Sequence, residues 1–145
     1  MGTQQLLLIV LGVVIVGIAI AVGVTMFRSN AQSSDRDQVV SDLENLGSKA
    51  QQYYRKPLSF AGGSYDFLNF NLMPLDTGNG DGSYSITTTQ PTDAGFVPGS
   101  LTSISSSSQL LYIVGCGNET GNNGTDPVKA YLTVTKDSLI VTILN

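Results

Sequence analysis

The sequence has no histidine, and its single cysteine is Cys116. One thiol cannot close a disulfide within the chain, so the fold must be held together by the burial of apolar side chains. Without histidine, the usual histidine–cysteine zinc sites and the Ser/His/Asp arrangement are excluded. Cys116 lies in the apolar run LLYIVGCGN, and we interpret it as a small buried side chain, because no histidine can activate it as a nucleophile. The sequence thus predicts neither enzymatic activity nor a cofactor.

Charge is also scarce. The chain has 7 lysines and arginines against 11 acidic residues, a formal net charge of -4, and no block of either sign. Binding to nucleic acid needs clustered basic side chains that neutralise phosphates, and the scattered basic residues do not form such a cluster. No pair of carboxylates stands out as a general acid and base. We therefore expect no nucleic-acid partner and no enzyme.

Two glycine-rich segments are candidates for binding or modification. GNGDG at 78–82 has no basic residue beside it, and its oxygens fall at the wrong offsets for a calcium loop, so we interpret it as a turn. GNETGNNGTDP at 117–127 is expected to be a loop. It carries two Asn-x-Thr triplets, at Asn118 and Asn123, which are candidate glycosylation sites on an exported chain.

A long apolar run dominates the N-terminus. LLLIVLGVVIVGIAIAVGV covers residues 6–24, and no charged side chain precedes Arg28. About 20 apolar residues are enough for a helix to cross a bilayer. A secretory signal peptide is disfavoured, because MGTQQ lacks a basic residue and the apolar run is too long. Two interpretations stay open: a plain membrane anchor, and an apolar helix that leaves the membrane to pack with copies of itself.

Small residues recur within this run. Gly12, Gly17 and Gly23, with alanines among them, would let helix backbones approach closely in lipid, where no hydrophobic drive exists between helices. Glycine is common in membrane spans, so each one alone is weak support for packing. We predict that packing between copies uses these small residues and the branched side chains around them: Leu6, Leu7, Leu8, Ile9, Leu11, Gly12, Val14, Ile15, Gly17, Ile18, Ala21 and Gly23.

The helical pattern continues beyond the apolar run. An apolar stripe with spacings of 4, 3, 4 and 3 follows, which predicts helix-to-sheet packing by Val39, Leu43, Leu46, Ala50 and Tyr53. Acidic residues precede basic ones along this stretch, which suits the helix dipole, and Pro57 ends the helix. We therefore predict one helix from about Thr3 to about Tyr54, roughly 75–80 Å long.

The C-terminal region has the pattern of strands and turns. YSITTT at 84–89 and QLLYIVG at 109–115 are expected strands, the second of them central. VKAYLTVT and SLIVTIL alternate apolar and polar residues around a turn at Lys136 and Asp137, which predicts a β-hairpin. An antiparallel sheet with one apolar face needs a cover, and the helix stripe supplies it. The expected fold is α+β, with an apolar helix at 1–27, its amphipathic continuation at 28–56 and a β-rich head at 57–145.

Together these parts resemble the type IV pilins and their pseudopilin relatives. The opening MGTQQLLLIVLGVVIVGIAIAVG is similar to their N-terminal assembly helix, and about the first 55 residues carry the resemblance. The resemblance implies cleavage by a prepilin peptidase, a membrane-inserted precursor pool, and extraction by a motor-driven assembly machine. The product would be a homopolymer of identical subunits at the cell surface, with the apolar helices in its core and the heads as its coat.

The chain departs from the family pattern at several points. Those proteins commonly begin with an N-methylated Phe and have Glu at the fifth position, where this chain has Met1 and Gln5. An amide can still accept a hydrogen bond from a terminal amine, so the resemblance implies Met1 and Gln5 as the N-terminal assembly contact. The family's mid-helix proline and frequent C-terminal disulfide are missing. Because no basic residue precedes the span, the chain fits either a mature form without its leader or one whose Met1 is the initiator.

Three functions follow as expectations. The first is a structural subunit of an extracellular type IV pilus-like filament. The second is a pseudopilin or minor pilin of a secretion or DNA-uptake machine, which the sequence barely distinguishes from the first. The third is a single-span membrane-anchored protein with a binding head, in which Gly12 or Gly17 could be replaced by leucine without loss of function.

Overall fold

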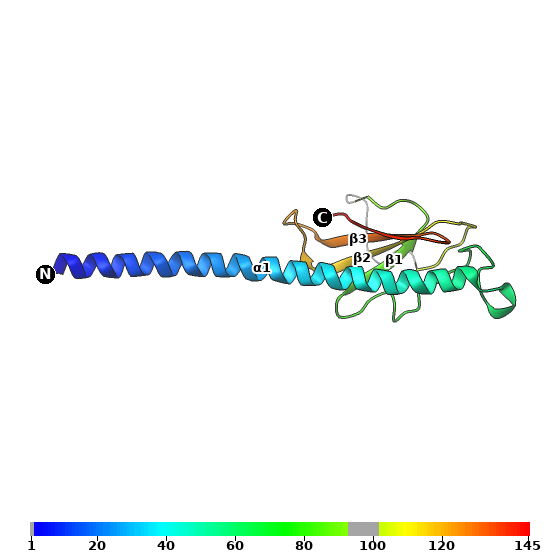
Figure 1. Cartoon of the computed structure of the whole chain (residues 1–145), viewed down its shortest axis with the longest axis horizontal. Coiled ribbons are helices and arrows are strands. Elements are labelled where there is room, and N and C mark those ends of the chain that lie inside the picture. Colours follow the sequence, from blue (N-terminus) through cyan, green and yellow to red (C-terminus); the bar gives the residue numbers. More distant parts are fainter. Residues whose placement is uncertain (1, 93–101) are drawn as a thin grey trace.

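The computed structural model describes residues 2–92 and 102–145. This part of the chain contains one long helix, a short 3-10 helix and four strands: α1 (Gly2–Arg55), η1 (Leu58–Phe60), β1 (Gly82–Thr87), β2 (Leu111–Thr120), β3 (Pro127–Val134) and β4 (Leu139–Ile143). The second half of α1 lies along one face of the sheet, and the first half projects beyond it (Figure 1). The predicted α+β fold, a long N-terminal helix on a C-terminal antiparallel sheet, is confirmed.

The helix α1 is unbroken over 54 residues, and each end lies within one residue of its predicted position. At 1.5 Å per residue it is about 80 Å long. It ends before Pro57, and its last carbonyl groups are capped by the chain that follows. Gly63 N–H donates to the carbonyl oxygen of Tyr53 over 2.8 Å, and Tyr65 N–H donates to that of Tyr54 over 2.7 Å. These bonds satisfy acceptors that a helix end leaves open.

The four strands form an antiparallel meander in the order β1-β2-β3-β4. β2 pairs with both β1 and β3, so the predicted central position of the QLLYIVG strand is confirmed. The predicted hairpin is also present, because β3 pairs with β4 across the turn that contains Lys136 and Asp137. Thr135 N–H donates to the carbonyl oxygen of Ser138 over 3.0 Å and closes that turn.

Two strand boundaries differ from the prediction. β1 begins at Gly82 and ends at Thr87, earlier at both ends than the predicted strand at 84–89. β2 runs on to Thr120, so the prediction of one loop over 117–127 was wrong at its beginning. The pairing register between β2 and β3 shifts between Cys116 and Thr120. Hydrogen bonds from this irregular stretch to Asp35 of α1 hold it in place. A contact between residues so far apart in the chain leaves no periodic pattern in the sequence.

The apolar core lies between α1 and the sheet. Val39, Leu43 and Ala50 of the helix are fully buried, in one cluster with Ile113 of β2 and Leu132 of β3. Each branched side chain of this size contributes about 1.5–3 kcal/mol when it is buried completely. The second half of α1 is therefore an integral part of the head, and no residue of 2–92 or 102–145 outside the helix covers its first half.

Candidate functional site

The first half of α1 exposes a large apolar surface. Its large apolar side chains from Leu6 to Phe27 are 49–77% exposed. The residues predicted to pack between copies all lie in this half, and they are exposed except for Gly23, which is partly covered. Gln5 is exposed as well, whereas Met1, the other predicted contact residue, lies outside the described residues. In the described part of the chain, no segment covers this half of the helix.

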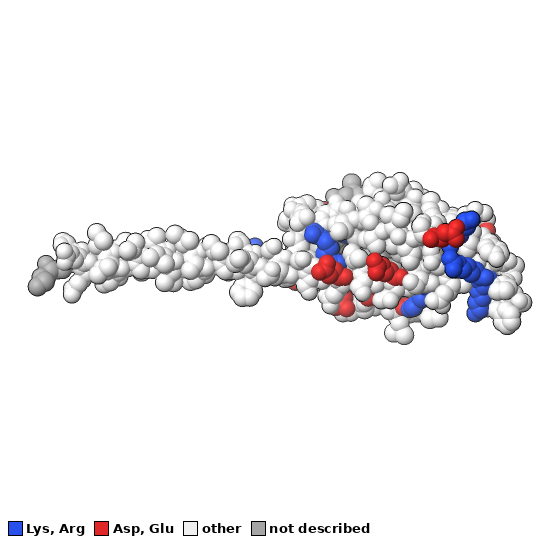
Figure 2. Space-filling view, in the orientation of Figure 1, with Lys and Arg blue, Asp and Glu red and all other residues white. Residues whose placement is uncertain are grey.

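The glycines of this half lie on open helix surface. A methyl group at Gly12, Gly17 or Gly23 would meet no atom of the described chain within 4 Å. Small size at these positions has no packing role inside one subunit, but it permits another helix to approach closely. The half carries no charged side chain before Arg28 (Figure 2). By length and composition α1 could cross a membrane, since its most apolar window has a mean hydropathy of 3.2 and is 0% buried.

The joint between this uncovered half and the head is stiff. The helix passes through it without a break. Just beyond the joint, Gln32 Nε2 donates to Asn122 Oδ1 over 3.1 Å, and Arg36 Nη2 donates to the main-chain oxygen of Asn145 over 3.0 Å. The head therefore fixes the direction in which the apolar half projects, unlike a head that is tethered by a flexible linker.

Asp35 anchors the irregular end of β2 to the helix. Its side chain is buried and accepts hydrogen bonds from the N–H groups of Asn118 and Glu119 over 3.3 and 3.1 Å. Gly117 lies beside it, and a methyl group there would come within 2.0 Å of Asp35 Oδ2. The carboxylate thus replaces ladder partners that the register shift removes. Sequence reasoning missed this contact, although a glycine inside a strand often marks a close approach.

The predicted helix-to-sheet stripe lies on the sheet with one difference. Four of its five members are buried: Val39, Leu43, Leu46 and Ala50. Tyr53 is only partly buried, and its hydroxyl donates to the carbonyl oxygen of Leu68 over 2.7 Å. The neighbouring Tyr54, which the prediction omitted, is the buried aromatic side chain. A step of four residues from Ala50 reaches Tyr54 and fits a helical stripe as well as a step of three, so spacing alone could not choose between them.

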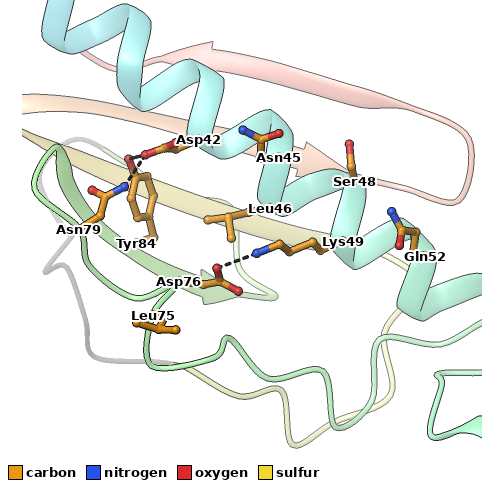
Figure 3. A pocket seen from close by; sticks show the side chains of 10 residues that line it. All are labelled: Asp42, Asn45, Leu46, Ser48, Lys49, Gln52, Leu75, Asp76, Asn79 and Tyr84. Carbon is orange, nitrogen blue, oxygen red and sulfur yellow. Dashed lines mark hydrogen bonds and ion pairs between the residues drawn. The ribbon is translucent and has the colours of Figure 1, made fainter.

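A cleft of about 430 Å³ opens between α1 and the segment that leads into β1 (Figure 3). Its charged groups are paired with other groups of the cleft. Asp42 Oδ2 accepts hydrogen bonds from Tyr84 Oη and Asn79 Nδ2, both over 2.7 Å, and Lys49 Nζ lies 2.7 Å from Asp76 Oδ1. Burial, and then the hydrogen bond to Asp42, raises the pKa of Tyr84, so its hydroxyl stays protonated and donates. These contacts fasten the loop to the helix.

The structure also places the GNGDG segment and Cys116. In the GNGDG segment, Asn79 Oδ1 accepts from the N–H groups of Asp81 and Gly82, both over 2.9 Å, which makes the predicted turn. Burial raises the pKa of the Cys116 thiol to about 11, so it is a poor nucleophile at neutral pH. Within residues 2–92 and 102–145, no group of three or more His, Cys, Asp or Glu side chains is placed to hold a metal ion.

The two candidate glycosylation sites are both exposed. Asn118 lies at the end of β2 rather than in a loop, and its Nδ2 donates to the carbonyl oxygen of Gly80 over 2.8 Å. Asn123 lies in the loop that follows, and its Nδ2 donates to Asp126 Oδ2 over 2.9 Å. A glycan on either nitrogen would displace the bond that the nitrogen makes. Glycosylation at these positions stays a prediction.

No protein-family model, no curated protein and no solved structure matches this chain. The candidate site is therefore defined by the structure of this chain alone. It is an apolar half-helix that the described part of the chain leaves uncovered and that continues without a break into a packed head.

Proposed function

We propose that this chain is the structural subunit of an extracellular type IV pilus-like filament. It would be a homopolymer in which the apolar halves of α1 form the core and the heads form the coat. A membrane would hold the apolar half before assembly, after a prepilin peptidase has processed the chain. The observation that carries the proposal is the uncovered apolar half of α1, which is 0% buried over its most apolar window and rigidly continuous with the head.

The energetics favour copies of the chain as the final cover. A large apolar side chain gains about 1.5–3 kcal/mol when it moves from water to full burial, so the sixteen exposed ones from Leu6 to Phe27 would together gain roughly tens of kcal/mol. Lipid supplies most of this gain already, so packing must add close contact between helices, and Gly12, Gly17 and Gly23 offer the space for it. Leaving lipid also needs work, which fits a motor-driven assembly machine as the partner.

The main alternative is a single-span membrane-anchored protein with a binding head. The length and hydropathy of α1 favour it, because the same helix could remain in a bilayer. The two functions differ in what they require of the glycines. An isolated span tolerates a larger side chain on its lipid face, whereas a packed fibre core does not.

The test begins with cells that express the chain. Material sheared from them is imaged by negative stain, and its N-terminal peptide is identified by mass spectrometry. We expect fibres made of this chain, and discrete monomers or small micelles would contradict the proposal. In a second step, Gly12→Leu and Gly17→Leu should abolish fibres, while the matched control Val16→Leu should keep them. Fibres that persist in both glycine variants would refute close packing at Gly12 and Gly17, whereas a membrane-bound chain that forms no fibres would favour the anchored protein.

A further inference from the structure

The end of the head farthest from the N-terminus exposes apolar side chains beside basic ones. Residues 55–61 are exposed without interruption, and η1 buries none of its residues. Leu58 is 74% exposed, and Phe60 and Tyr65 are each 68% exposed. Arg55 and Lys56 come directly before them. Surface apolar residues usually occur singly, so this group is a candidate contact surface. We call residues 55–61 together with Tyr65 the tip.

The tip is held in one conformation. Ala61, Ser64 and Tyr65 have φ values of 56°, 49° and 69°, a left-handed region that is unfavourable for a residue other than glycine. Hydrogen bonds to the end of α1 hold this backbone, including one of 2.9 Å from Ser64 N–H to the carbonyl oxygen of Lys56. The apolar side chains of the tip are thus presented outward by a fixed backbone, in spite of the strain.

The net charge of α1 changes sign along the head. Residues 28–44 carry four acidic and two basic residues, whereas 45–56 carry three basic and no acidic residues. Asp37, Glu44 and Arg55 are 7 and 11 residues apart, so their Cα atoms lie on one helix face, and Arg55 Nη2 also donates to the carbonyl oxygen of Lys136 over 2.9 Å. We call Asp37 and Glu44 the acidic stripe. At 1.5 Å per residue, Arg55 lies about 16 Å beyond Glu44 and about 27 Å beyond Asp37 along the helix.

We propose that the tip of one subunit packs against the acidic stripe of a second copy of this chain. The two helices would be parallel, and the second copy would be displaced toward the tip by about 16–27 Å, which brings Arg55 and Lys56 to Glu44 and Asp37. Without displacement, parallel copies would place acids against acids. This inference rests on the proposed filament and specifies a contact within its coat.

Two features favour another subunit as the occupant of the tip. The tip and the acidic stripe are different surfaces, so their contact is heterologous and does not close, which builds an open filament. The tip also lies at the opposite end of the molecule from the apolar half of α1 (Figure 1), so it cannot touch a membrane that this half spans. When the second copy is displaced in this way, the apolar halves of the two α1 helices still lie side by side over part of their length.

The first experiment identifies what the tip touches in fibres. A photo-cross-linking phenylalanine derivative replaces Phe60, and fibres are assembled from a mixture of isotopically heavy and light subunits. After irradiation, tryptic peptides are analysed by mass spectrometry. We expect a cross-link between subunits to the peptide of residues 37–49. Cross-links only within one subunit, only to other peptides, or to lipid or another protein would overturn the proposal.

The second experiment exchanges the charges and also covers the case in which the cross-linking variant does not assemble. Lys56→Glu and Glu44→Lys should each reduce the yield of fibres at least tenfold, and the double variant should restore it. Glu119→Lys is the control, because it makes the same change at an exposed residue outside the stripe. A double variant no better than the single ones would refute the contact. Absence of fibres from the unmodified chain would instead refute the proposed function.

Discussion

Two hydrogen bonds of Asp35 join α1 to the sheet, and removing them tests how strongly they stabilise the head. The side chain is 7% exposed and accepts two backbone hydrogen bonds, from Asn118 over 3.3 Å and from Glu119 over 3.1 Å. Asp35→Ala would remove the acceptor of both N–H groups. A net hydrogen bond to a charged group contributes about 1.5–3 kcal/mol, and because Asn118 and Glu119 are exposed, water can replace part of the lost bonding. We therefore expect the free energy of unfolding to fall by about 2–4 kcal/mol.

The assay is urea unfolding of the whole chain in detergent micelles, followed by the near-ultraviolet circular dichroism of its tyrosines. Asp35→Asn keeps one oxygen acceptor but loses the charge, so we expect a smaller loss, about 1 kcal/mol. Asp37→Ala is the control, because this residue is exposed and should change the stability by less than about 0.5 kcal/mol. If Asp35→Ala behaved like the control, the two bonds would not hold the helix to the sheet and the reasoning would be refuted.

Three further predictions concern the head. Gly117→Ala places a methyl group 2.0 Å from the Asp35 carboxylate, so it should lower the unfolding free energy by about 1–3 kcal/mol in the same urea assay. Tyr84→Phe removes the 2.7 Å bond to Asp42 and should cost about 1–2 kcal/mol. The folded-state pKa of Tyr84 is raised, so the unmodified chain should lose stability as the pH rises above about 10, and the variant should show less of this loss in unfolding curves measured across that range. The Cys116 thiol, with a pKa of about 11, should react with iodoacetamide at pH 8 about a hundredfold more slowly than in the unfolded chain, and equal rates would contradict its burial.

The sequence alone determined the features that depend on short-range periodicity. The apolar run and the stripe that follows it lie on one continuous helix, and a proline marks its end, so α1 could be placed almost to the residue. The alternating runs at the C-terminus determined the hairpin in the same way. The apolar half-helix could be recognised as a surface that needs partners, because a helix that is apolar all round cannot be covered by so small a head.

Only the tertiary structure decided which residues make the helix and the sheet fit together. Whether Tyr53 or Tyr54 is buried depends on the angle of α1 over the strands, and spacings of three and four are both helical. The extension of β2 depends on Asp35, which is 83 residues from Asn118 in the sequence. The tip conformation depends on the carbonyl groups at the end of α1. Local pattern determines what an element is, but contacts between residues far apart in the chain determine where each side chain lies, and a single sequence carries no periodic signal of such contacts.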